Sequence, residues 1–399
     1  MEEAVKENTK KNSPWEVLQT ATRLGITSFG GPIAHLGYFR EEYVNRRKWI
    51  DEKKYADLVA LCQFLPGPAS SQVGIAIGFM RAGYLGALAA WIGFTLPSVI
   101  ALIIFAYFVK GSSFTETGWL HGLLVVAVAV VAQAVWGMAK NLAADRPRGT
   151  IAIIATIITL LVPNAIGQVG TIIGAGVIGW LLFREHSDTK IETKFTFSSA
   201  QKRGMGLLIL FFILLFGLPI LRQIVDWKIL ALLDSFYRSG ALVFGGGHVV
   251  LPLLQSEVVP TGWVTQEEFL SGYGAAQAVP GPLFTFASYL GMVANGWSGA
   301  IIATIGIFLP AFLLIIGALP FWDWLRHHPS FAAALRGINA AVVGILLAAL
   351  YDPVWTKAIH TSLDFVLVLI SFSLLVLWKF PPWIVVIVGA VGGYVFSYF

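Results

Sequence analysis

The chain alternates long apolar runs with short polar segments, and the runs have the length of membrane-spanning helices. A helix needs about 20 apolar residues to cross a bilayer. Runs without a charged residue cover positions 82–109, 119–139, 150–183 and 204–221, and a shorter one covers 365–377. They do not alternate polar and apolar residues as the strands of a membrane barrel do. Because helices are then the remaining way to satisfy the backbone in lipid, we predict an all-α integral membrane protein.

Two segments near the start of the chain are interrupted by glycine and proline. The segment 15–44 is broken by Gly-Gly-Pro at 30–32, and the segment 55–80 by Pro-Gly-Pro at 66–68. Proline ends the preceding helix and suits the first turn of the next. Each piece has about 10 to 16 residues, which span about 15 to 24 Å, less than a bilayer core of about 30 Å. We therefore predict re-entrant hairpins of half-helices that enter the membrane, break and return.

The pattern occurs twice along the chain. Residues 23–31 read RLGITSFGG, and residues 238–246 read RSGALVFGG. The Pro-Gly-Pro motif returns at 280–282, and FTLP at 94–97 returns as IFLP at 307–310. A duplicated apolar chain of this kind predicts two structural repeats.

The matching polar segments of the repeats carry opposite charge. Lys53 and Lys54 precede the first Pro-Gly-Pro, whereas Glu267 and Glu268 occupy the same place before the second. Segment 252–269, expected to be a loop, holds glutamates and no lysine or arginine, while the expected loop 322–337 is basic. Since basic loops stay in the cytoplasm, we predict that the second repeat is inverted in the membrane and that the N-terminus is cytoplasmic.

The charge pattern also sets the expected organisation. We predict a cytoplasmic tail at 1–13, a first repeat at 14–183, a cytoplasmic linker at 184–203, a connecting transmembrane helix at 204–225 and a second repeat at 226–399. If each repeat begins and ends on one face, the single connecting helix turns the second repeat over. The tail lacks the apolar core of a cleavable signal peptide.

Composition narrows the class of protein further. The chain is 57% hydrophobic and 12% charged, whereas soluble domains carry roughly 25% charged residues. Its net charge of +5 lies in short loops. Basic loops of this kind orient a membrane protein, so the charge does not indicate a nucleic-acid partner. Cys62 is the sole cysteine, so no disulfide or CxxC motif exists. The sequence contains no GxxxxGK[ST], HExxH or GxSxG motif and no metal-ligand spacing, so we expect no enzyme, no metal and no cofactor.

Candidate chemistry gathers at the breaks. A helix that starts inside the membrane presents free N–H groups and the positive end of its dipole, which together attract an anion. Hydroxyl and amide side chains lie close to each break. The candidate substrate-binding residues are Arg23, Phe29, Gly30, Gly31, Gln63, Pro66, Gly67, Pro68, Ser70 and Ser71 in the first repeat, and Arg238, Phe244, Gly245, Gly246, His248, Gln277, Pro280, Gly281, Pro282 and Thr285 in the second.

Plain structural roles stay open for all of these residues. The prolines can kink ordinary helices, the glycines can serve close helix packing, and the arginines can reach the membrane interface. His35 and His248 do not align between the repeats, and a lone histidine is more often a packed side chain. The presence of both motifs at matched places in both repeats favours a transporter site.

Long stretches of the chain resemble the chromate ion transporter family in its two-domain form. The first half carries SFGGPIAHLGYFREEYV, RKWIDEKKYADLVALCQFLPGPASSQVG and GFTLPS, and the second carries FGGGHVVLP, GYGAAQAVPGPLFTFASYLG and IFLPAF. The resemblance implies a secondary transporter in the cell membrane that exports chromate, with sulfate as an analogue, and confers chromate resistance. It also implies antiparallel repeats and a role for the breaks and Arg23.

Three alternatives to chromate export by alternating access stay open. The first is a permease for sulfate or another oxyanion, the second is an anion channel, and the third and least favoured is a membrane enzyme. A homodimer also stays open, and the lipid bilayer is the expected surrounding.

Overall fold

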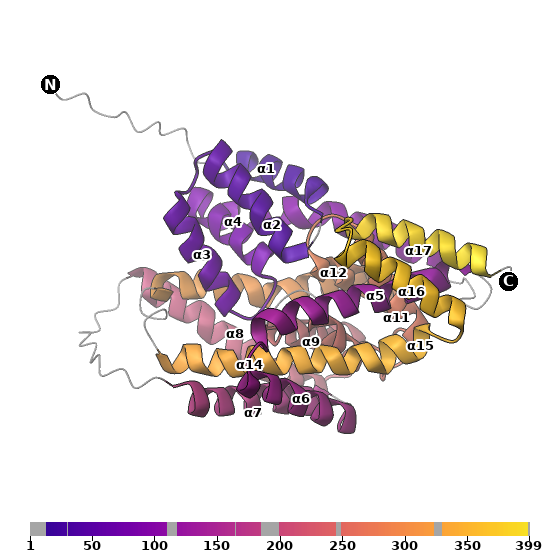
Figure 1. The fold of residues 1–399 in the computed structure, drawn as a ribbon. Coiled ribbons are helices and arrows are strands. Elements are labelled where there is room, and N and C mark those ends of the chain that lie inside the picture. The colour runs from indigo at the N-terminus through magenta and orange to yellow at the C-terminus, as the bar shows by residue number, and fades with distance from the viewer. Residues whose placement is uncertain are drawn as a thin grey trace.

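The computed structural model describes residues 13–29, 31–109, 118–163, 165–184, 199–244, 249–322 and 329–397. Throughout these ranges the chain is helical and contains no strand (Figure 1). The first repeat comprises α1 (Pro14–Thr27), α2 (Gly31–Phe39), the π-helix η1 (Arg40–Arg46), α3 (Glu52–Phe64), α4 (Ala69–Val109), α5 (Gly118–Leu142), α6 (Arg146–Leu161) and α7 (Ala165–Phe183). Helix α8 (Ser199–Ile224) joins it to the second repeat.

The second repeat follows the same order. It comprises α9 (Lys228–Ala241), α10 (Val250–Val258), α11 (Gln266–Ala278), η3 (Leu283–Thr285), α12 (Phe286–Ala318), η4 (Leu319–Phe321), α14 (Pro329–Ala349), η5 (Leu350–Trp355), α15 (Thr356–Ala358), α16 (Ser362–Val376) and α17 (Pro382–Phe396). The expected loop 252–269 is wrong in its extent, because α10 and α11 occupy most of it. The expected loop 322–337 is likewise too long, since α14 begins at Pro329. In α10, buried apolar residues at helical spacing (Leu251, Leu254 and Val258) let the helix continue past the charged Glu257.

Helices α4 and α12 each fold back on themselves at the same relative position. In α4 the turn lies at Ala82 (φ −144°, ψ 28°) and Gly83 (φ 63°, ψ −152°). In α12 it lies at Asn295 (φ −151°, ψ 27°) and Gly296 (φ 63°, ψ −151°). The glycine permits the positive φ, which other residues adopt at a cost. The two repeats therefore share a backbone conformation as well as a sequence pattern.

The hairpins of the first repeat begin and end on one face. Glu16, at the start of α1, lies 3.2 Å from Arg47, which follows η1. The same carboxylate lies 3.7 Å from Arg81, at the turn in α4. In the second repeat Lys228, at the start of α9, donates to the Ala294 carbonyl beside the turn in α12 (2.7 Å). These contacts confirm the prediction of half-helices that enter, break and return.

The turns of the two repeats lie at opposite ends of the arm of α4 that follows Gly83. Trp297 follows the turn in α12, and its indole N–H donates to the hydroxyl of Tyr107 near the end of α4 (3.1 Å). Gly83 is 24 residues earlier on the same helix, about 36 Å away at 1.5 Å per residue. The outer ends of the two sets of hairpins thus point to different ends of the molecule.

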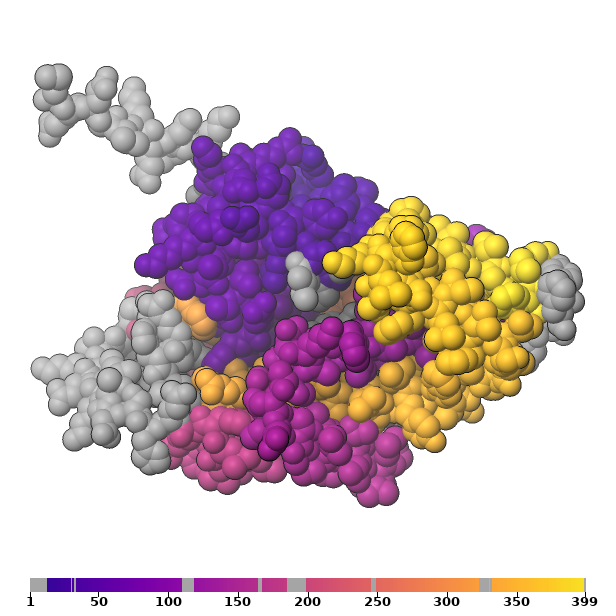
Figure 2. Space-filling view, viewed as in Figure 1, coloured from indigo at the N-terminus to yellow at the C-terminus, as the bar shows by residue number. Residues whose placement is uncertain are grey.

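The remaining helices are exchanged between the repeats. Helix α5 of the first repeat packs against α16 and α17 of the second, while α14 of the second packs against α6 and α7 of the first. Close approaches of glycine to glycine make this possible, at Gly122 and Gly389 and at Gly179 and Gly337. In Figure 1, α5 runs between α14 and the pair α16 and α17, and Figure 2 shows the same helices filling the space beside the lobe of α1 to α4. The repeats therefore form one interlocked core.

The surface is apolar enough for lipid. Five helical stretches within the described part of the chain are long and apolar enough to cross a membrane. Helix α8 is one of these, and its Phe212, Phe216 and Ile220 are more than half exposed. Apolar surface of this extent is costly in water. The chain is a multi-pass membrane protein.

Candidate functional site

The four breaks meet through two matched backbone hydrogen bonds. The N–H of Gly67, in the first Pro-Gly-Pro, donates to the carbonyl of Val243 (2.7 Å). The N–H of Gly281, in the second, donates to the carbonyl of Ser28 (2.9 Å). Ser28 and Val243 each precede the Phe-Gly-Gly motif of their own repeat. The structure thus brings the four interrupted segments together, while a role in binding stays a prediction.

Glycine is required at the centre of both Pro-Gly-Pro motifs. Gly67 has φ 118° and Gly281 has φ 92°, conformations that side chains disfavour. A Cβ on Gly281 would lie 2.5 Å from the Ser98 hydroxyl and 3.1 Å from the Phe94 carbonyl oxygen. The flanking prolines end α3 and α11, and the glycine lets each break approach the other repeat closely.

The carbonyl groups freed by the breaks receive side-chain donors. The amide of Gln72 donates to the Pro66 carbonyl (2.8 Å). The hydroxyl of Ser98 donates to the Pro280 carbonyl. A buried carbonyl without a donor would cost free energy, so these two side chains stabilise the interrupted backbone.

Further polar groups line the start of α4 without such partners. Nδ1 of His35, on α2, lies 3.3 Å from the hydroxyl of Ser70. Nε2 of His35 and the hydroxyls of Ser28 and Ser71 are buried and have no hydrogen-bond partner among the described residues. Buried polar groups are normally paired. Unpaired donors next to a helix N-terminus, where the dipole is positive, are suited to an anion.

The other predicted residues are placed less uniformly. Gln63 and Arg23 are exposed, whereas Gln277 is half-buried and its amide nitrogen has no partner in the described chain. The hydroxyl of Thr285 donates to the Pro282 carbonyl three residues earlier (2.8 Å), so it is occupied within its own 3-10 turn, and this geometry argues against direct contact with an anion. The remaining described candidates lie in the breaks themselves. Gly31 begins α2, and Phe29 contacts Trp383 of α17 with ring centroids 6.3 Å apart. Pro68 and Pro282 are buried, while Pro66, Pro280 and Phe244 are half-buried. Gly30, Gly245, Gly246 and His248 lie outside the described residues.

Arg238 is held by two carboxylates. Its guanidinium donates to Asp234 (2.9 Å) and to Glu257 (2.7 and 2.8 Å). Asp234 also lies 3.3 Å from Arg222. Because the charge of Arg238 is balanced by buried acids, this geometry favours a structural role and argues against direct contact with an anion.

Sequence reasoning did not select four residues that the structure brings to the breaks. Ser28 and Ser98 lie next to the breaks but not in the Phe-Gly-Gly or Pro-Gly-Pro motifs, Gln72 follows the first Pro-Gly-Pro, and a lone histidine such as His35 is more often a packed side chain. The signal that could have found them is their position in one repeat opposite apolar residues in the other.

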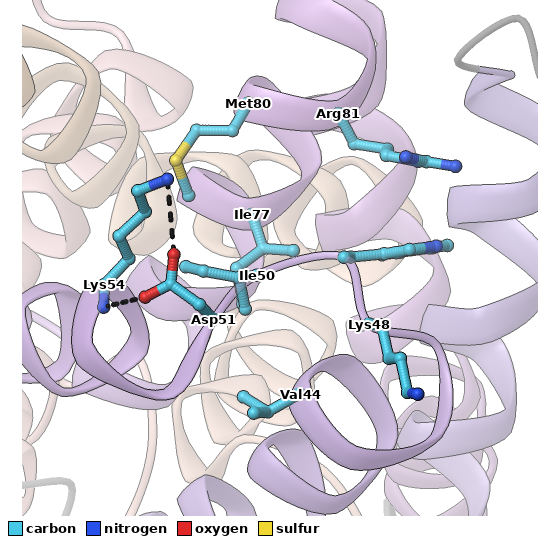
Figure 3. A pocket seen from close by; sticks show the side chains of 9 residues that line it. Val44, Lys48, Ile50, Asp51, Lys54, Ile77, Met80 and Arg81 are labelled. Atoms are coloured by element: carbon cyan, nitrogen blue, oxygen red, sulfur yellow. Dashed lines mark hydrogen bonds and ion pairs between the residues drawn. The ribbon is translucent and has the colours of Figure 1, made fainter. Parts of the chain in front are cut away.

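A cavity lies elsewhere, at the outer ends of the first hairpins. It measures about 570 Å³ and is lined by the basic residues Lys48, Lys54 and Arg81. Lys54 pairs with Asp51 (3.2 Å). In Figure 3, Ile77 and Met80 lie between Lys54 and Arg81. This basic rim surrounds the entry to the hairpins and does not contain the breaks.

A helical membrane protein in which two repeats bring four interrupted helices together has the architecture of a secondary transporter. The comparison with protein families specifies which kind. The chain belongs to the chromate transporter family, whose model matches residues 15–180 and 230–394.

Three relatives illustrate how far the similarity extends. The chain is 29% identical to an uncharacterized transporter of Methanocaldococcus jannaschii over 96% of this chain and 95% of that protein. It is 29% identical to the chromate transport protein of Pseudomonas aeruginosa over 83% of this chain and 78% of that protein. An uncharacterized transporter of Bacillus subtilis is 29% identical over 41% of this chain and 95% of its own length, so its match has about the length of one repeat. No solved structure matches the chain.

Proposed function

We propose that this protein carries chromate across the cell membrane and binds it where the four breaks meet. The observation that carries the proposal is the pair of matched bonds from Gly67 to Val243 and from Gly281 to Ser28. They bring the N-terminus of α4 and unpartnered buried donors to one place. The name of the P. aeruginosa relative supports chromate as the oxyanion.

The orientation in the membrane follows from charge. The basic rim of Lys48, Lys54 and Arg81 is the cytoplasmic side, and with it the N-terminus. The turn at Gly296 lies at the far end of α4 from Gly83 and belongs to the outer side, with Glu267 and Glu268 in the first turn of α11. Inverted repeats of this kind support alternating access by rocking of one repeat against the other.

The expected direction is export. Moving a dianion out of a cell with a negative interior is favourable by roughly 4.6 kcal/mol per 100 mV, twice the value for one charge. The membrane potential alone therefore suffices to drive efflux, and cells that hold the protein gain resistance to chromate.

Uptake of radiolabelled chromate into inverted membrane vesicles tests the proposal. We expect accumulation that depends on an imposed potential and exceeds that of vesicles without the protein. Absence of uptake under every potential and pH gradient contradicts it. Strong inhibition by sulfate would instead assign a general oxyanion permease, and channel-like conductance in planar bilayers would assign an anion channel.

A further inference from the structure

Around the breaks the first repeat carries polar side chains at six positions where the second repeat is apolar, on a backbone that both share. Ser28, His35 and Ser70 of the first repeat correspond to Val243, Val250 and Phe284 of the second. The same contrast continues outward from the breaks, in the pairs Gln72 and Phe286, Thr95 and Phe308, and Ser98 and Ala311. The apolar members are all buried.

Two of the polar residues have structural partners and are explained by the fold. Gln72 and Ser98 satisfy the Pro66 and Pro280 carbonyls. Ser28, His35 and Ser71 each keep a buried polar atom that can donate and for which the described chain offers no partner, as does the Thr95 hydroxyl, whereas Gln72 keeps only an unpaired acceptor oxygen. Each of Ser28, His35 and Ser71 is at most 3% exposed. Burying such groups without a bond costs stability, so their presence needs another reason.

We propose that His35, with Ser28 and Ser71, forms the hydrogen-bond donor set that holds a tetrahedral oxyanion, and that this set belongs to the first repeat alone. When the Ser70 hydroxyl donates to Nδ1 of His35, the ring proton resides on Nε2 and points a donor at the anion. The Ser71 hydroxyl lies in the first turn of α4, whose free N–H groups add to the donor set. The second repeat closes the site with valine and phenylalanine.

The position of Thr285 provides the matched control. Thr285 corresponds to Ser71, but its hydroxyl is already bonded to the Pro282 carbonyl. Gln277 also holds an unpartnered amide nitrogen, yet its counterpart Gln63 is exposed. The two glutamines therefore do not form a symmetric pair of ligands, and the asymmetry of the site extends to them.

The inference rests on the proposed function, and the test separates the two. Purified full-length protein is titrated with radiolabelled chromate and with sulfate, and its thermal unfolding is followed with and without either anion. Wild-type protein that binds and transports neither anion contradicts the proposed function. Wild-type protein that binds, but whose response to mutation is symmetric between the repeats, contradicts only the inference.

We expect His35→Val and Ser71→Ala each to weaken anion binding about tenfold or more and to lose the thermal stabilisation by anion. His35→Gln, which keeps a donor, recovers much of the affinity, and Thr285→Val changes it less than about twofold. Ser71→Ala also keeps or raises the unfolding temperature without anion, because it removes an unsatisfied polar atom. A purely structural serine would show the opposite pair of effects.

Two results overturn the inference. One is anion affinity within about twofold of wild type in both His35→Val and Ser71→Ala. The other is a larger loss from Thr285→Val than from Ser71→Ala. If His35→Val fails to fold, Ser71→Ala decides the matter, since it removes a single oxygen atom that has no protein partner.

Discussion

The breaks of the two repeats have the same backbone but different side chains. Both central glycines have positive φ, and both donate to the residue before the other repeat's Phe-Gly-Gly motif. The freed carbonyl of Pro66 is satisfied by Gln72 from its own repeat, whereas that of Pro280 is satisfied by Ser98 from the opposite repeat. The difference teaches that the interrupted backbone is a requirement of the fold, while the side chains around it were free to diverge toward function.

Small differences in length between the repeats are absorbed locally. The first repeat has one more residue between His35 and Trp49 than the second has between Val250 and Trp263. The π-helix η1 lies within that stretch, and a π-bulge accommodates one extra residue. The second repeat has one residue fewer between Pro282 and its turn than the first has after Pro68. There the three residues of η3 rise about 2.0 Å each instead of 1.5 Å, which recovers about the length of one helical residue.

The largest expected effect distinguishes the two central glycines. Gly281→Ala forces a side chain into a positive φ and places its Cβ 2.5 Å from the Ser98 hydroxyl. Gly67→Ala meets a similar backbone penalty, but its nearest neighbour is the flexible end of Gln72 at 3.1 Å. We expect Gly281→Ala to abolish chromate uptake and Gly67→Ala to reduce it. Equal and unchanged uptake in both variants would remove the breaks from the site.

The next effect separates the two matched arginines. Arg238→Gln leaves Glu257 buried without this partner and Asp234 with Arg222 alone, which costs about 3 kcal/mol of folding free energy. Arg23→Gln changes an exposed residue and should alter stability by less than about 0.5 kcal/mol. Thermal unfolding in detergent measures both. A transport defect in a stable Arg23→Gln protein would then assign this arginine to the path of the anion, and an Arg238→Gln protein as stable as wild type would refute the structural role.

Much of this arrangement could be predicted from the sequence, because glycine and proline interrupt helices through local sterics. The hairpins and the equivalence of the repeats both follow from such local patterns. The exchange of α5 and α14 between the repeats could not be predicted, since the sequence of an apolar helix does not show which other helix it packs against. The partners of Arg238 were also hidden, because Glu257 is 19 residues away and meets it only when α9 and α10 pack. The donor role of His35 was missed for a similar reason, because a histidine alone does not reveal whether its second nitrogen is paired.

A smaller and equal effect is expected at the two helical turns. Gly83 and Gly296 have the same φ of 63°, and neither would bring a Cβ within 4 Å of another atom. Replacement by alanine therefore costs the backbone penalty alone, about 1 to 2 kcal/mol. Gly83→Ala and Gly296→Ala should lower the unfolding temperature by similar amounts in matched thermal scans. A marked difference between them would show that the two turns are not equivalent.

The smallest effect concerns the caps of α3 and α11, which occupy equivalent positions. The Asp51 carboxylate accepts from the Lys54 N–H, and the Thr265 hydroxyl accepts from the Glu268 N–H. Thr265→Ala should cost about 1 kcal/mol, and Asp51→Ala should also lower the unfolding temperature at neutral pH.

Acid distinguishes these two caps. The hydrogen bond from the Lys54 N–H, together with the Lys54 ammonium, lowers the pKa of Asp51 below its usual value. The contribution of Asp51 is therefore complete above the pKa it has in the unfolded chain, and it is lost as the pH falls through the lower pKa of the folded protein. The difference in unfolding temperature between wild type and Asp51→Ala should shrink over that range, whereas the Thr265 hydroxyl accepts its bond whatever the pH. A difference for Asp51→Ala that stays constant down to the acid limit would mean that the carboxylate charge does not contribute to the cap.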